Sequence, residues 1–225
     1  MKEKQLLILR LEGALQSWDD NSKWDGRGTG EFPTKSGVVG ILGCAMGFER
    51  GSKELIDLSD HMVMAVRSDR AGEMTTDFQT VTGYPLLNAD GKPKSTGPTI
   101  ISRRSYLQDA CFTVVLELET EWRDRIIEAL KKPKWAAYLG RKACVPSRPI
   151  LECENPEYTD IDDALRRYPA ANRAKYPMMF ETERRQDNLS SISHADNLVD
   201  AARGFTRRQV WRGLIEEETD VSVKN

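Results

Sequence analysis

Two neighbouring stretches, ACFTVVLEL at residues 110–118 and WRDRIIEAL at residues 122–130, carry the clearest patterns in this sequence. The first alternates and is rich in β-branched residues, which predicts a strand. The second spaces its apolar residues as one face of an amphipathic helix does, and Lys131-Lys132-Pro133 ends that helix. This part of the chain is therefore expected to be a strand followed directly by a helix.

Similar patterns lie on both sides of this unit. Residues 5–11 and 62–68 are predicted strands, residues 146–151 are expected to be extended, and an apolar, glycine-rich helix begins after Thr34 or Ser36, either of which suits an N-cap. The resulting order up to residue 150 is the βαββαβ order of an α+β, ferredoxin-like core, an arrangement that many RNA-binding modules share.

The remaining segments are predicted with less regular structure. Residues 69–104 are too long for an ordinary loop, which favours a protruding hairpin or arm. Residues 151–225 are more polar and end in a strand-like stretch at 209–215. We therefore expect two parts, a core over residues 1–150 and a small β-rich C-terminal subdomain over residues 151–225.

The composition limits the kind of partner. The 225 residues carry a formal net charge of -2, so any surface for a polyanion must be local. The apolar run Leu6–Leu9 is too short for a signal core or a membrane span, which favours a cytoplasmic protein that does not contact a membrane. No Cys-x-x-Cys pair is present and the two histidines lie far from the four cysteines, so neither a metal nor a cofactor is expected.

Two motifs could hold phosphate groups, and each has a structural alternative. Thr34, Lys35 and Ser36 place hydroxyls, a cation and free N–H groups at a helix start, but an ordinary capped helix would look the same. Arg103 and Arg104 stand with Tyr106 at the mouth of a strand, where they could bridge phosphates and stack on a base. A solvated strand end is the alternative there.

Two further motifs place aromatic residues beside polar ones. Residues 131–144 are the densest basic and aromatic segment; a helix end explains Lys131 and Lys132 but leaves Arg141 and Lys142 unexplained. Gln16 and Trp18 directly follow the first strand, where packing in the core is the alternative to contact with a ligand.

Catalytic motifs are scarce. Metal-free RNA cleavage needs a base for the 2′-hydroxyl and an acid for the leaving oxygen, and histidine serves best in both roles. His61 precedes a predicted strand and His194 lies in a polar tail, so both are expected to be structural. Tyrosine or lysine could substitute, which keeps an enzyme possible.

In combination, these motifs resemble one family, the CasD family, whose members cap the 5′ end of the guide RNA in type I-E CRISPR surveillance complexes (Cascade). The matching stretches, in order, are Leu9–Gly13 with Gln16–Trp18, Phe32–Gly37, Asp77–Val81, Tyr106–Phe112, Tyr138–Cys144 and, more weakly, Arg208–Trp211. The resemblance implies a ferredoxin-like core of the repeat-associated RAMP type, with a β-hairpin thumb within about Thr75 to Arg103.

The resemblance also implies a function. Members grip the 5′ handle of the CRISPR RNA, contact the backbone and large subunits of the complex and reach target DNA only through it; in this subtype they are not catalytic. In the related I-C subtype the corresponding protein cuts the precursor RNA, so an endoribonuclease remains the alternative. The residues expected to bind RNA are Gln16, Trp18, Arg27, Thr34, Lys35, Ser36, Arg103, Arg104, Tyr106, Tyr138, Gly140, Arg141 and Lys142.

Overall fold

The computed structural model describes residues 4–19, 26–83, 85–87, 91–93, 99–199 and 204–217. Its centre is an antiparallel sheet in the order β4 (Met62–Arg70), β7 (Cys111–Glu119), β1 (Lys4–Glu12) and β8 (Leu151–Cys153). With the helices that connect these strands, this is the order of a ferredoxin-like core, and the predicted βαββαβ arrangement is confirmed.

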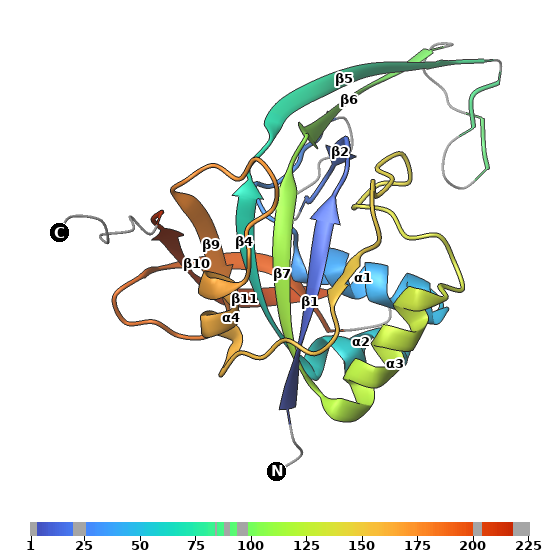
Figure 1. Cartoon of the computed structure of the whole chain (residues 1–225). Helices are drawn as coiled ribbons and strands as arrows, with labels where there is room; N and C mark the ends of the chain where they lie inside the picture. Colours follow the sequence, from blue (N-terminus) through green and yellow to red (C-terminus); the bar gives the residue numbers. More distant parts are fainter. Residues whose placement is uncertain are drawn as a thin grey trace.

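Helices cover both faces of the central sheet (Figure 1). One face packs against α1 (Lys35–Met46), α2 (Lys53–Asp60) and α3 (Thr120–Lys131). The short helix α4 (Ile161–Arg167) lies on the opposite face. Successive residues of β1 point to opposite faces, so Leu7 and Leu9 join the first core while Ile8 joins the second.

The glycines of α1 admit a neighbouring ring. A Cβ at Gly37 would lie 3.0 Å from a ring carbon of Trp18, so the indole packs directly on the helix backbone. Of the two N-cap candidates, Thr34 and Ser36, Thr34 is the N-cap, and its Oγ1 accepts from the Gly37 amide at 3.2 Å. The helix ends at Gly47, which has a φ of 75°.

The predicted thumb is confirmed. Strands β5 (Glu73–Thr82) and β6 (Thr99–Gln108) form an antiparallel hairpin that projects from the body (Figure 1). Residues 84, 88–90 and 94–98 of this insert lie outside the described residues. The other edge of β6 pairs with two short strands, β2 (Leu15–Gln16) and β3 (Gly26–Arg27), which join the thumb to the body.

The C-terminal third is β-rich, but its strands are continuous with the core. β9 (Met178–Thr182) pairs with β4, and β11 (Phe205–Ile215) and β10 (Ser190–Leu198) extend the sheet further, to seven strands in all. The expected division at residue 150 therefore does not coincide with a break in the sheet. No helix in the described ranges is long and apolar enough to cross a membrane.

Candidate nucleic-acid interface

A groove of about 730 Å³ lies where α1, the turn after residue 137 and strand β3 come together. Its floor is the exposed side of α1, including Gly40, where an added Cβ would meet nothing within 4 Å. The predicted residues that line it are Trp18, Arg27, Thr34, Ser36, Tyr138, Gly140 and Arg141. The structure thus brings four separate stretches of sequence to one hollow beside the thumb.

The turn over residues 138–144 forms one wall, and its backbone holds it in place. The Leu139 amide donates to the Cys144 carbonyl at 2.7 Å, and both side chains are fully buried. Gly140 has a φ of 88°, and a Cβ there would lie 1.7 Å from the carbonyl oxygen of Ser17. Only glycine fits this position, which sets Tyr138 and Lys142 at the surface.

Arg141 acts as a pin between the turn, β3 and the thumb. Its guanidinium donates to the carbonyls of Ser105 at 3.0 Å, Arg27 at 2.9 Å and Gly28 at 2.8 Å. It also lies 4.9 Å over the ring of Tyr106. The expectation that Arg141 serves simply to neutralise phosphate is therefore incomplete, because three of its N–H groups hold the groove wall together.

Tyr106 does not offer a face to a base. Its side chain is 4 % exposed, because it packs in the core and is covered by Arg141. Gln16 and Trp18 are also interior: the Gln16 amide donates to the carbonyls of Leu11 and Ala110 and accepts from the indole N–H of Trp18 at 3.0 Å. These residues build the groove from below, as the packing alternative for that motif predicts.

At the start of α1, Lys35 and two of the next amides pair with protein groups, so Lys35 is not available to a phosphate, whereas Thr34 and Ser36 line the groove. The Lys35 amide donates to Asp196 at 2.7 Å, and the Lys35 ammonium lies 3.2 Å from Glu183. The Gly37 amide donates to the Thr34 hydroxyl, and the Val38 amide donates to the Thr34 carbonyl. Lys35 is 5 % exposed, so its charge interacts with buried protein groups and not with solvent.

A buried charge network beneath α1 explains this arrangement. Arg208 donates to Asp196 at 2.6 Å and to Glu183 at 3.2 Å, which ties β10 and β11 to the helix start. Burial opposes ionisation of Asp196, but the bonds from Arg208 hold the pKa of that carboxyl below its usual value. At Glu183 the effect of burial, which raises the pKa of the carboxyl, is larger than the lowering by the positive charges of Lys35 and Arg208.

Four of the predicted cations keep more open positions than Lys35. Arg27 and Lys142 are exposed, and Arg104 is half-buried and stands beside Arg27 in the parallel β3–β6 register. Arg103 points to the other face of the thumb, where its guanidinium lies 5.6 Å from the ring of Phe78. Arg103 therefore belongs to the thumb surface, whereas Arg27 lines the groove and Arg104 is its neighbour in the sheet.

Sequence reasoning missed part of the lining. Phe205 is 48 % exposed and faces the groove from the C-terminal strands, next to Leu198, and exposed Arg50 lies beyond the end of α1. The only sequence signal for Phe205 is an aromatic residue at the start of the last strand. The neighbouring sequence does not show whether such a residue is exposed or lies in the core. These residues add an aromatic surface and a cation to the groove lining.

Neither histidine lies in the groove. His61 Nδ1 is 2.8 Å from the Asp57 carbonyl, and His194 Nε2 is 3.2 Å from both oxygens of Glu181. The bond from Glu181 raises the pKa of His194, and burial partly opposes it. Within the described ranges, no group of three potential metal ligands is gathered.

Comparison with known proteins identifies the family. A family model described as "CRISPR-associated protein (Cas_Cas5)" matches residues 6–213. The chain is 36 % identical over 160 residues to the "CRISPR system Cascade subunit CasD" of Escherichia coli (strain K12), a match that covers 66 % of this chain and 70 % of that protein.

Solved structures agree over nearly the whole chain. A chain of a "CRISPR RNA-guided surveillance complex" matches with a TM-score of 0.74 at 29 % identity, covering 94 % of this chain and 90 % of that one. A "Crystal structure of Cas protein" matches with a TM-score of 0.72 at 29 % identity, covering 95 % and 96 %. The resemblance drawn from the motifs is confirmed, and the protein belongs to the CRISPR-associated (Cas_Cas5) family.

Proposed function

We propose that this protein is a non-catalytic RNA-binding subunit that grips the 5′ handle of a CRISPR RNA and caps one end of a type I-E surveillance complex, where it contacts the backbone and large subunits. Membership of the family supports this, as does the likeness to a chain of an RNA-guided surveillance complex. The observation that carries the proposal is the groove beside the thumb, which combines exposed cations and aromatic side chains with an open helix floor.

The groove suits a single strand rather than a duplex. Arg27 in the groove, with Arg104 and Lys142 next to its walls, would contact phosphates. Unpaired bases would lie on the α1 floor against Tyr138 and Phe205. A base stacked on an aromatic side chain contributes roughly 1–3 kcal/mol. The thumb would then cross the strand where the handle ends.

Holding the RNA is favoured over cutting it. Both histidines are engaged by other protein groups away from the groove, so no imidazole stands near the bound strand to move a proton. Incubating the protein alone with repeat RNA in chelator tests this directly. Intact RNA is expected, and site-specific cleavage would instead assign the endoribonuclease activity of the I-C kind.

Binding is tested with the full chain and a labelled RNA of the handle sequence from the cognate repeat. Lys142→Glu combined with Tyr138→Ala changes two exposed side chains of the turn over residues 138–144, of which Tyr138 lines the groove. We expect at least a roughly tenfold loss of affinity, from one stack and one phosphate contact. The matched control is Arg185→Glu, a side chain 79 % exposed and outside the groove. Unchanged handle binding together with defective complex assembly would assign the wall to protein docking.

A further inference from the structure

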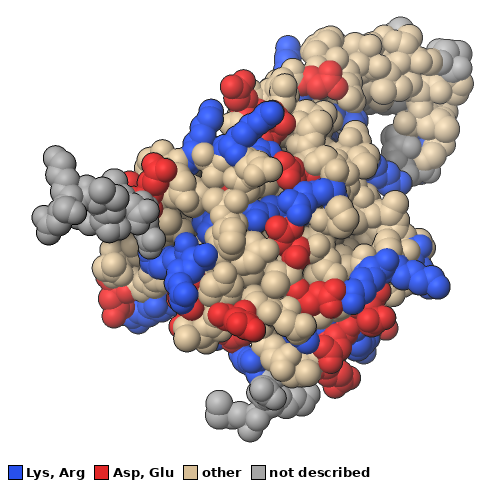
Figure 2. Space-filling model, viewed as in Figure 1, with Lys and Arg blue, Asp and Glu red and all other residues tan. Residues whose placement is uncertain are grey.

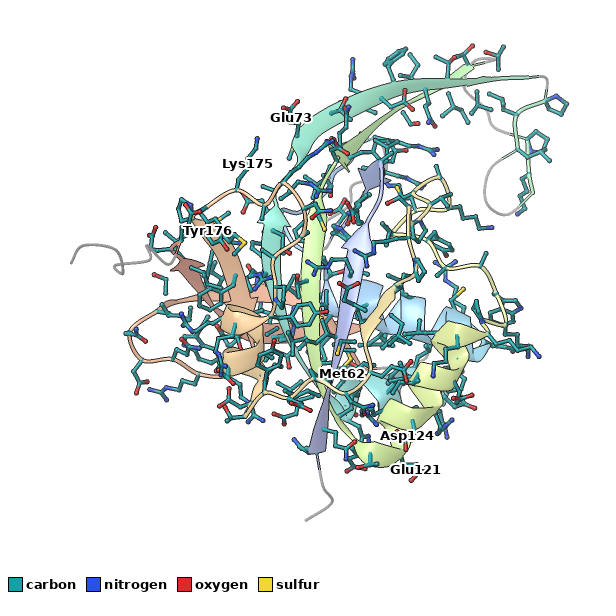
Figure 3. The ribbon with its side chains drawn as sticks, viewed as in Figure 1. Met62, Glu73, Glu121, Asp124, Lys175 and Tyr176 are labelled. Atoms are coloured by element: carbon teal, nitrogen blue, oxygen red, sulfur yellow. The ribbon has the colours of Figure 1, made fainter. Side chains whose placement is uncertain are left out.

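A second hollow, of about 490 Å³, opens at the root of the thumb; we refer to it as the thumb-root pocket. One side is formed by the start of β5 and the β6–β7 turn, with Glu73 and Asp109. The other side is a loop that carries Arg173, Lys175 and Tyr176. Figure 3 shows Lys175 on the same side of the molecule as Glu73 and Tyr176, near the base of β5.

The loop is fixed to the interior by buried charges. Asp69, fully buried, accepts from the Ala171 amide at 2.7 Å through its carboxylate, and its carbonyl accepts from the Lys175 amide at 3.0 Å. The carbonyl of Pro169 accepts from Arg10 at 3.1 Å and from Arg67 at 3.3 Å. Buried ion pairs cost desolvation and contribute little net stability. Here they preorganise the backbone that supports three surface side chains.

Backbone strain gathers at the same place. In the described part of the chain, the non-glycine residues with positive φ are Asp109 at 61° and Arg173 at 62°, and both line the thumb-root pocket. A left-handed conformation is costly for a residue with a long side chain, and such residues concentrate at ligand sites. Asp adopts this conformation readily in a tight turn such as β6–β7, so the strain is at Arg173, whose side chain lines the pocket.

Two cationic side chains of this loop, Arg173 and Lys175, are available to a ligand. Within the described ranges, the side chains of Arg173 and Lys175 make no hydrogen bond or ion pair. Arg70, which lines the same pocket, differs: it donates to Glu12 and to the carbonyls of Asp109 and Asn172. Two charges thus remain available for an anion, beside a tyrosine that is 41 % exposed.

We propose that the thumb-root pocket holds one nucleotide of the RNA strand just 3′ of the handle, an inference that rests on the proposed function. Arg173 and Lys175 contact its phosphate and Tyr176 stacks on its base. The carboxylates of Glu73 and Asp109 accept from amino groups on the base edge, which a simple anion lacks. The pocket therefore fits a nucleotide better than inorganic phosphate.

The position of the pocket supports this path. The handle groove reaches the thumb through β3, which pairs with one edge of β6, whereas the thumb-root pocket includes the start of β5 on the other side of the hairpin. A strand that leaves the groove and passes the thumb arrives at β5. Because the handle is the 5′ end, the nucleotide received there lies on its 3′ side.

The test compares two RNAs on the full chain: the handle alone, and the handle extended at its 3′ end by a short run of adenosines, whose bases carry an amino group. The variant combines Arg173→Gly, which suits a positive φ, with Lys175→Gln, both at exposed positions. For the natural protein we expect the extension to tighten binding by about fivefold or more. The variant should lose that gain and keep its affinity for the handle alone. Tyr176→Ala should act in the same direction, and Arg185→Gln should change neither value.

The outcomes separate the two proposals. If the natural protein does not bind the handle alone, the proposed function fails. If it binds the handle but gains nothing from the extension, or if the variant gains equally, the thumb-root pocket is not a nucleotide site while the proposed function stands. A variant that keeps the full gain but joins the backbone subunit poorly would assign the pocket to a protein partner and overturn the inference.

Discussion

Gly140 shows how a single residue shapes the groove. Its φ of 88° and the approach of the Ser17 carbonyl leave no room for a side chain. We expect Gly140→Ala to lower the free energy of unfolding by about 2 kcal/mol or more, measured by urea denaturation. The control is Gly40→Ala on the open face of α1, which should raise stability by up to about 1 kcal/mol. Equal effects at both glycines would contradict this account of the turn.

A second prediction concerns the guanidinium of Arg141. Because its guanidinium serves three carbonyls at once, a lysine with its single ammonium cannot replace it. Arg141→Lys should lower the free energy of unfolding by about 2 kcal/mol and weaken handle binding as well. Lys142→Ala, one residue further along on an exposed side chain, should leave stability unchanged. A stable Arg141→Lys protein with normal RNA binding would show that the pin is dispensable.

Individual roles were the least predictable part of the site. The sequence singled out the motif around Tyr138 to Lys142, part of which lines the groove, but it could not show that Arg141 covers Tyr106 or that Lys35 meets Glu183. Both contacts join residues far apart in the chain. Whether a cation faces solvent or a buried carboxylate depends on such partners, and a local pattern contains no information about them.

Helix α1 is the element that gives the groove its floor. Gly40 is exposed and has open space above it, so a larger side chain there fills the groove and leaves the core untouched. We expect Gly40→Leu to fold with undiminished stability and to bind handle RNA roughly tenfold more weakly, the equivalent of one lost base stack. Gly40→Ala should have a much smaller effect on binding. Full affinity in the leucine variant would place the RNA elsewhere.

The pairing of β9, β10 and β11 predicts a dependence on pH. Glu181 on β9 raises the pKa of His194 on β10, with Asp196, Arg208 and Arg212 also nearby. A raised pKa in the folded state means that protonation stabilises the fold; this contribution is complete below the ordinary value of about 6.5 and is lost as pH rises through the raised value.

Urea denaturation across neutral pH measures this contribution. The free energy of unfolding should fall as pH rises, and the His194→Gln variant should show a flatter profile. An unchanged slope in the variant would mean that another group is responsible.

The helices and strands differ in how well their sequence patterns predict them. β1, β4, β7 and α3 have strong apolar periodicity and were predicted within a few residues. β10 has the sequence SSISHADNL, in which Asp196 and His194 take part in buried or half-buried ion pairs. A strand stabilised by ion pairs shows little of the apolar alternation on which prediction depends, so β10 was missed.

For the whole molecule, a seven-stranded sheet carries a thumb, and hollows open in the body beside it and at its root. The order of the core and the thumb followed from the sequence. The continuation of the sheet through the C-terminal third did not, because strand pairing over such separations leaves no local mark. Figure 2 shows lysine and arginine interspersed with acidic residues over the body, in keeping with the net charge of -2.

The central claim is that the groove beside the thumb holds handle RNA through phosphate contacts and stacking. The most direct measurement is the affinity of the full chain for handle RNA over a series of salt concentrations. The logarithm of the binding constant should fall by roughly 0.7 per log unit of salt for each phosphate neutralised. The slope should be shallower by about that amount in Lys142→Gln and unchanged in Arg185→Gln. An affinity that does not respond to salt, or equal slopes in both variants, would contradict the claim.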